Sequence, residues 1–180
     1  MGGELWQHKT EWKNDPTEAF QNVQRAFLEE NYDLPALIEE HLKSAREAVE
    51  ITKREGDPYD LMAMYREQLA MLEQVSSEPL PEGSMERIEL LRKLYGNSGE
   101  GIGNVLDVEG VSEEGGFLIA RILKRDDLQS LFGTLTPTEE DVEPAISSIF
   151  EMVDRGESVC FPVYSEEEPV AWQFIGCTID

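Results

Sequence analysis

Apolar residues in the first half of the chain recur every three or four positions, the spacing that gathers them on one face of an α-helix. Three of these stretches follow a helix-start signal: Asp15-Pro16, Asp57-Pro58 and Ser84. Such caps satisfy the free backbone N–H groups of a first turn, and proline suits the first helical position. We therefore predict helices at residues 15–31, 35–55, 58–74 and 84–95. Short connections predict that the long helices are antiparallel neighbours.

The pattern changes between Gly96 and Gly103, where four of eight residues are glycine, as expected of a flexible connector. Short apolar runs follow at Val105–Val108 and Phe117–Leu123, and either one suits a strand. A short helix is predicted at Asp126–Phe132, before Gly133. The capping sequence Thr136-Pro137-Thr138-Glu139 predicts a longer helix over residues 137–155.

The chain closes with a predicted antiparallel hairpin of two strands, Ser158–Tyr164 and Pro169–Ile179. If Tyr164 faces Val170, then Cys160 faces Phe174. Phe161, Val163, Ile175 and Cys177 then share the other face. Both faces are too apolar for a solvated ribbon. We expect the 137–154 helix and the Phe117–Leu123 strand to cover them.

These elements predict an α+β fold. A helical region of three to four helices (residues 1–95) is followed by a connector (residues 96–103) and a small α/β part that ends in the hairpin (residues 104–180). One compact domain overall remains an alternative. Residues 1–14, with Trp6 and Trp12, are expected to form a polar arm laid on the fold.

Charge narrows the choice of partner. The 180 residues carry 38 acids against 15 bases, a net charge of −23, and between Asp126 and Asp180 there are 13 acids and one base, Arg155. This field repels nucleic-acid phosphates and anionic lipids and attracts a basic protein surface. We therefore predict a basic protein partner, with neither nucleic acid nor membrane. The competing interpretation is that acidity serves only solubility.

No signal-peptide pattern or membrane-spanning apolar run is visible, and Cys160 and Cys177 are predicted on opposite faces of the hairpin, unable to form a disulfide. A reducing cytoplasm is the expected location.

Candidate catalytic groups are few. The glycine-rich stretch lacks the Lys-Ser/Thr ending of a phosphate-binding loop. Neither His8 nor His41 has a candidate nucleophile close to it in the sequence. Cys160 lies among apolar residues, where a thiol is usually inert. The acid clusters lack calcium-loop spacing. We expect no catalytic residue, cofactor or metal site.

The favoured interpretation is a non-enzymatic acidic interaction protein: an inhibitor, an immunity-type protein or an adaptor. Its candidate partner-binding residues are acids at the hairpin tip and at a helix start, with one aromatic: Glu166, Glu167, Glu168, Glu139, Glu140, Asp141 and Trp172. Two alternatives stay open. One is a small enzyme with a scattered Asp/Glu/Tyr/His site, and the other is a structural or regulatory subunit with an apolar patch at the Trp172/Phe174 face.

The C-terminal half also shows a resemblance. It is carried by Leu128–Thr134 (LQSLFGT), Thr136-Pro137-Thr138, Arg155-Gly156 and the closing segment Gln173–Asp180 (QFIGCTID), with a looser match at Trp12–Phe20. These residues resemble a group of small bacterial proteins that share an LFGT turn, a Pro-Thr helix start and a terminal aromatic-x-Gly strand. Cys177 stands where a tyrosine would be expected. The resemblance supports the fold and brings no activity with it.

Overall fold

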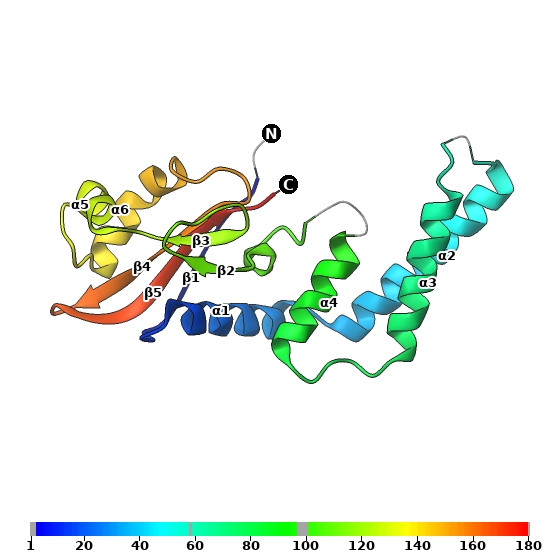
Figure 1. The fold of residues 1–180 in the computed structure, drawn as a ribbon, viewed down its shortest axis with the longest axis horizontal. Helices are drawn as coiled ribbons and strands as arrows, with labels where there is room; N and C mark the ends of the chain where they lie inside the picture. Colours follow the sequence, from blue (N-terminus) through cyan, green and yellow to red (C-terminus); the bar gives the residue numbers. More distant parts are fainter. Residues whose placement is uncertain (1–2, 58, 97–100, 180) are drawn as a thin grey trace. The chain divides into compact units, whose positions relative to one another are not determined.

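The computed structural model describes residues 3–57, 59–96 and 101–179 and has an α+β fold (Figure 1). The contacts divide the chain into two compact units. Unit 1 comprises Met1–Leu28 and Glu100–Asp180, and unit 2 comprises Glu29–Gly99. This division differs from the predicted boundaries, since the N-terminal residues cluster with the C-terminal part. Residues 97–100 of the predicted connector lie outside the described residues.

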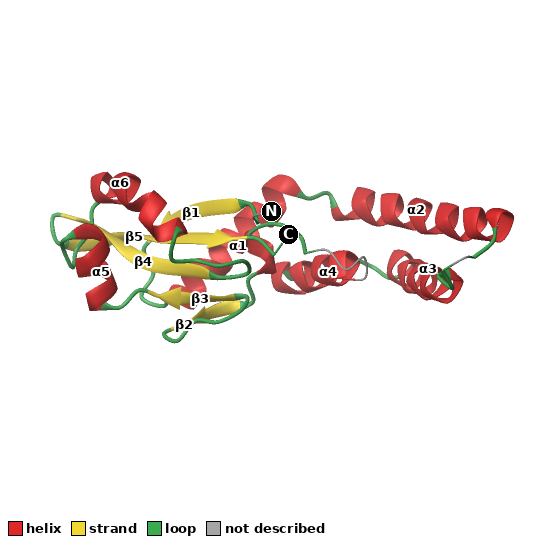
Figure 2. Ribbon diagram, turned by 90° about the horizontal axis from the view of Figure 1, so that it is seen from above, coloured by secondary structure: helices red, strands yellow, loops and turns green. Residues whose placement is uncertain are grey.

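A five-stranded mixed sheet forms the centre of unit 1 (Figure 2), with strand order β1-β5-β4-β3-β2. The strands are β1 (Leu5–Glu11), β2 (Gly110–Ser112), β3 (Ile119–Ile122), β4 (Ser158–Ser165) and β5 (Glu168–Cys177). β5 pairs antiparallel with β1 and with β4, whereas β2, β3 and β4 are parallel. The hairpin is therefore central, and β1 and β2 form the edges.

The expectation of an N-terminal polar arm was wrong, because Leu5–Glu11 is an edge strand. Its side chains alternate between faces: Trp6 is buried while Gln7 is exposed. The Trp6 ring lies over Gly176 of β5, where a Cβ atom would come within 2.3 Å of it. Glycine at position 176 therefore lets the indole cover β5.

The segment at residues 105–108 was also predicted wrongly as a candidate strand, since Val105–Asp107 forms a 3-10 helix, η1. The buried Asp107 carboxylate accepts hydrogen bonds from the backbone N–H groups of Ile102 and Gly103, each at 2.8 Å. These bonds fold the chain back on itself. The second apolar run does form a strand, β3, and the short β2 was not predicted.

The C-terminal hairpin is confirmed, with Cys160 opposite Phe174 as predicted. A register shift between Val163 and Tyr164 places Tyr164 opposite Pro169 rather than Val170. The extra residue is a bulge, which locally increases strand twist.

One face of the sheet is covered by α5 (Arg125–Phe132) and α6 (Glu139–Phe150) (Figure 1). α5 ends at Gly133, whose φ of 68° is the left-handed conformation that glycine adopts without penalty. α6 is shorter than the predicted 137–155 helix, because the chain leaves it after Phe150 and turns at Gly156 before β4.

The other face of the sheet packs on α1 (Pro16–Asn31). The ring centroids of Phe20 and Phe174 lie 5.1 Å apart, and Trp12 stacks on Trp172, also at 5.1 Å. Both faces of the hairpin are therefore covered. The predicted helix covers one of them, but α1 covers the other, and β3 is a sheet neighbour of β4 rather than a cover.

Unit 2 contains α2 (Leu34–Glu55), α3 (Met62–Ser77) and α4 (Ser84–Gly96). α2 and α3 run antiparallel, as predicted (Figure 1). One buried cluster of this unit consists of Ile38, Ala45, Leu72 and Leu94, and Ile88 and Leu91 of α4 are also buried. α3 begins later than expected, because the Asp57 carboxylate accepts hydrogen bonds from the backbone N–H groups of Leu61 and Met62. Pro58 of the predicted start lies outside the described residues.

Among the helices of the described ranges, none combines the length and apolar character needed to cross a membrane.

Candidate functional site

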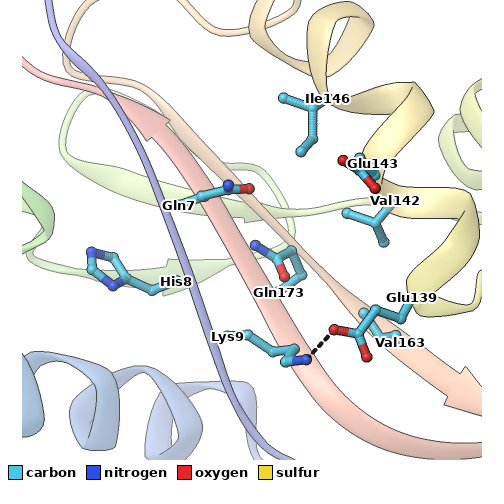
Figure 3. Close-up of a pocket in the computed structure, with 9 residues that line it drawn as sticks. All are labelled: Gln7, His8, Lys9, Glu139, Val142, Glu143, Ile146, Val163 and Gln173. Carbon is cyan, nitrogen blue, oxygen red and sulfur yellow. Dashed lines mark hydrogen bonds and ion pairs between the residues drawn. The ribbon is translucent and has the colours of Figure 1, made fainter.

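Two hollows lie on the α6 side of the sheet, toward the β1 edge. The first, which we call the glutamine hollow, has a volume of about 430 Å³ and is lined by Gln7, His8, Lys9, Glu139, Val142, Glu143, Ile146, Val163 and Gln173 (Figure 3). The second, the hairpin hollow, has about 390 Å³ and is lined by Lys9, Thr138, Glu139, Glu140, Val163, Tyr164, Ser165, Glu166, Val170 and Ala171. They share Lys9, Glu139 and Val163.

The hairpin hollow exists because the hairpin tip is tied to the start of α6. The backbone N–H of Tyr164 donates to the carbonyl of Pro137 at 2.8 Å, and Thr138 forms a parallel bridge with Tyr164. This connection brings the predicted residues Glu139 and Glu140, from the helix start, into one hollow with Glu166 of the tip.

The acids of the hairpin hollow differ in their partners. Glu139 forms an ion pair with Lys9 of β1. Glu140 and Glu166 are exposed, and neither carboxylate has a hydrogen-bond or ion-pair partner among the described residues. Glu140 also lies in the first turn of α6, where the helix dipole stabilises negative charge. Both carboxylates thus face solvent in the hairpin hollow.

Asp141 serves its own helix. Its carboxylate accepts hydrogen bonds from the backbone N–H of Thr138 at 2.8 Å and from the Thr138 hydroxyl at 2.7 Å. The backbone bond first, and the hydroxyl bond second, hold the pKa of Asp141 below its ordinary value. Its carboxylate is therefore already engaged.

Glu167 and Glu168 are exposed at the hairpin tip but do not line the hollow. Trp172 lies on the opposite, α1-facing side of the sheet and is 5% exposed. Its indole N–H donates to the carbonyl of Lys13 at 2.9 Å. That burial does not favour a partner-binding role for the ring.

The glutamine hollow has a polar floor. Gln173 projects from β5 into the space between β1 and α6 (Figure 3), and the residue as a whole is only 7% exposed. Within the described parts of the chain, no group hydrogen-bonds its side-chain amide. Val142, Ile146 and Val163 form an apolar wall, and Glu143 contributes an exposed carboxylate to the rim.

His8 contributes no ring to this hollow, because its side chain points to the other side of β1 (Figure 3). The ring centroid lies 5.8 Å from that of Trp6 and 5.1 Å from that of Phe27. In unit 2, the His41 ring lies 5.6 Å from that of Tyr95. Both imidazoles thus pack against aromatic rings.

Cys160 and Cys177 are free and buried on opposite faces of the sheet, as predicted. Burial raises the pKa of the Cys160 thiol to about 12, so the nucleophilic thiolate is suppressed near neutral pH. The described ranges contain no group of three His, Cys, Asp or Glu side chains that could hold a metal ion.

Lys9, Glu143 and Gln173 line these hollows and were not among the predicted site residues. Glu143 lies one helical turn after Glu139, and this spacing could have revealed it. Gln173 could have been noticed as a polar residue inside an otherwise apolar strand. Lys9 gave no signal, because its segment was not recognised as a strand. No family model, curated protein or solved structure matches the chain, so the resemblance to small bacterial proteins stays a prediction.

Proposed function

We propose that the chain is a non-enzymatic acidic interaction protein, of inhibitor, immunity or adaptor type, which binds a basic surface of a partner protein at the hairpin hollow. The observation that carries this proposal is the convergence of Glu140 and Glu166. The Tyr164–Pro137 hydrogen bond brings these carboxylates, which have no partner among the described residues, to one concave site. The surrounding negative charge would speed the encounter with a basic surface.

The backbone at the hairpin tip supports a role beyond solubility. Glu166 and Glu167 have φ values of 51° and 70°, in the left-handed region where glycine and asparagine are favoured. An acid placed to increase solubility works at any exposed position. Acids at these two positions instead impose a conformational penalty, which a binding role would offset.

Partner capture from the native host provides the test, with bound proteins identified by mass spectrometry at low and high salt. The Glu140→Lys/Glu166→Lys variant should lose the partner at low salt, and high salt should weaken capture by the wild type. The matched control is Glu113→Lys/Glu114→Lys, which makes the same charge change at exposed acids of unit 1 outside both hollows. Equal capture by both variants and the wild type at both salt levels would reject the proposal.

The alternative of an apolar patch at Trp172 and Phe174 receives no support, because Trp12 and Phe20 pack against these rings. No specific observation favours the scattered-site enzyme.

A further inference from the structure

Gln173 is a polar residue in an otherwise apolar, buried part of β5. Its neighbours along β5 are buried residues that pack on the sheet faces, yet it places an amide with two donors and an acceptor at a 7% exposed position. The amide makes no hydrogen bond to the described residues, yet it is not sealed from water, since Ser158 Oγ is the only fully buried side-chain N or O atom without a partner among them. The amide therefore opens into the hollow, where a ligand can reach it. By contrast, the amide of the other buried glutamine, Gln24, donates to the carbonyls of Val105 and Val108.

The surroundings of Gln173 define the ligand that would match it. The wall of the hollow is apolar, and the rim carries the carboxylates of Glu139 and Glu143. Lys9, the only lysine or arginine among the described lining residues, is paired with Glu139. An anionic ligand would therefore meet repulsion, whereas a ligand with an apolar stem and a cationic, hydrogen-bond-donating head would find partners for both ends.

We infer that the glutamine hollow receives an arginine side chain from the basic partner. The aliphatic stem would lie along Val142 and Ile146. The guanidinium carries only donors, in a planar fork that can reach two acceptors. Those acceptors are the side-chain carbonyl of Gln173 and the carboxylate of Glu143. The amide N–H groups of Gln173 remain available for a main-chain carbonyl of the arriving segment.

The size of the hollow agrees with this ligand. Its volume of about 430 Å³ lies within the range of roughly 300–1,000 Å³ that is typical of ligand sites. Arginine suits the site better than lysine, because the lysine ammonium is a compact point charge and cannot offer a planar pair of donors to Gln173 and Glu143 together. This inference rests on the proposed function and specifies what part of the partner the protein recognises.

The experiment is a titration of the ¹⁵N-labelled full chain with N-acetyl-arginine amide, followed by NMR. The matched probe is N-acetyl-citrulline amide, which keeps the shape and replaces the guanidinium by a neutral urea group. Arginine should shift the side-chain amide signals of Gln173 and Gln7 in a saturable way. Citrulline should bind about tenfold more weakly, since it loses the charge-assisted bond to Glu143.

Two variants and one control locate the binding. Glu143→Gln, on an exposed residue, should weaken arginine binding about tenfold, whereas Glu113→Gln should leave it unchanged. Gln173→Leu should weaken binding and change the urea midpoint little, because the amide makes no hydrogen bond to the described residues and opens into the hollow. A lower midpoint with unchanged arginine binding would assign Gln173 a purely structural role and overturn the inference. Should the Gln173 variant fold poorly, the exposed Glu143 variant still tests the pocket, and unchanged arginine binding by it would overturn the inference.

The outcomes separate this inference from the proposed function. Absence of a saturable response to arginine, or equal binding of arginine and citrulline, overturns the arginine pocket. If partner capture is nevertheless lost in Glu140→Lys/Glu166→Lys, the proposed function stands without it. If arginine binds as expected while that variant captures the partner normally, the pocket is supported and the docking role of the hairpin hollow is rejected.

Discussion

Lys9 of β1 forms an ion pair with Glu139 in the first turn of α6, across 130 positions of sequence. Both residues line the glutamine hollow and the hairpin hollow, so this pair stands where the two meet. An ammonium group of the chain itself thus lies where a basic group of a partner would be attracted. If the proposed partner binds here, Lys9 competes with its basic group for Glu139.

Removing this competitor should strengthen binding. Lys9→Met leaves Glu139 unpaired, and we expect capture of the basic partner to rise up to about fivefold, with stability changing by less than about 1 kcal/mol because the pair is exposed. Capture at low salt and urea denaturation measure the two effects. The control is Lys13→Met, since Lys13 pairs with Glu18 outside both hollows. Weaker capture by the Lys9 variant would instead show that Lys9 contacts the partner favourably.

The hairpin tip should show a trade between stability and binding. Two central turn residues at positive φ are typical of a type I′ turn, which prefers Asn-Gly. Glu166→Asn with Glu167→Gly should therefore raise the free energy of unfolding by about 1–2 kcal/mol while reducing partner capture. The same substitutions at Glu113 and Glu114 remove equal charge where the φ angles are not positive. If the control substitutions stabilise the protein as much as those at the hairpin tip, relief of backbone strain is not the cause of the gain in stability.

The sequence predicted the parts of the fold that depend on local signals. The helix starts at Asp15-Pro16 and Ser84 and the Cys160–Phe174 pairing all follow from caps and from two-residue alternation. The edge strand at Leu5–Glu11 depends on β5, whose paired residues lie 160 to 172 positions later, so nothing local identified it. The turn at Asp107 likewise depends on side-chain bonds to backbone that an apolar run does not reveal.

The candidate site was predictable only in pieces. Acids at the helix start and at the hairpin tip were identified separately from their sequence clusters. Their meeting depends on the Tyr164–Pro137 bond, which is a tertiary contact between segments whose sequences do not specify it. Periodicity likewise could not show which element covers the hairpin face that carries Trp172, because that depends on where α1 packs.

The two buried glutamines should respond differently to the same substitution. Gln24→Leu leaves the Val105 and Val108 carbonyls without their donor and should destabilise the protein by about 1–3 kcal/mol. Gln173→Leu removes an amide that has no partner among the described residues and opens into the hollow, so it should change stability by less than about 1 kcal/mol. Urea titrations of both variants measure the contrast. Equal destabilisation would mean that Gln173 has a structural partner in solution.

Phe174 should be among the most important side chains of unit 1. It is 0% exposed and packs on Phe20, so Phe174→Ala should lower the free energy of unfolding by about 3–5 kcal/mol. Phe117→Ala deletes the same atoms at a residue that is 64% exposed and should change stability by less than about 1 kcal/mol. A loss well below 1 kcal/mol for Phe174 in a denaturant titration would contradict the packing of α1 on the sheet.

Asp141 should make the stability of unit 1 depend on pH in the acid range. Hydrogen bonds from Thr138 lower the pKa of its carboxyl from the ordinary value of 3.8. A lowered pKa in the folded state means that the ionised carboxylate contributes stability above the unfolded pKa, and that this contribution is lost as pH falls through the lowered folded value.

Asp141→Asn keeps the shape of the side chain but cannot ionise. The wild type should therefore exceed the variant in stability by a constant amount between about pH 7 and pH 5, and the difference should shrink below about pH 4. Urea denaturation at a series of pH values measures it. Thr138→Val provides the graded control, because it removes the hydroxyl donor and keeps the backbone N–H, so it should show a smaller loss over the same range. A wild-type advantage over Asp141→Asn that stays constant down to the acid transition would show that the fold does not prefer the ionised form.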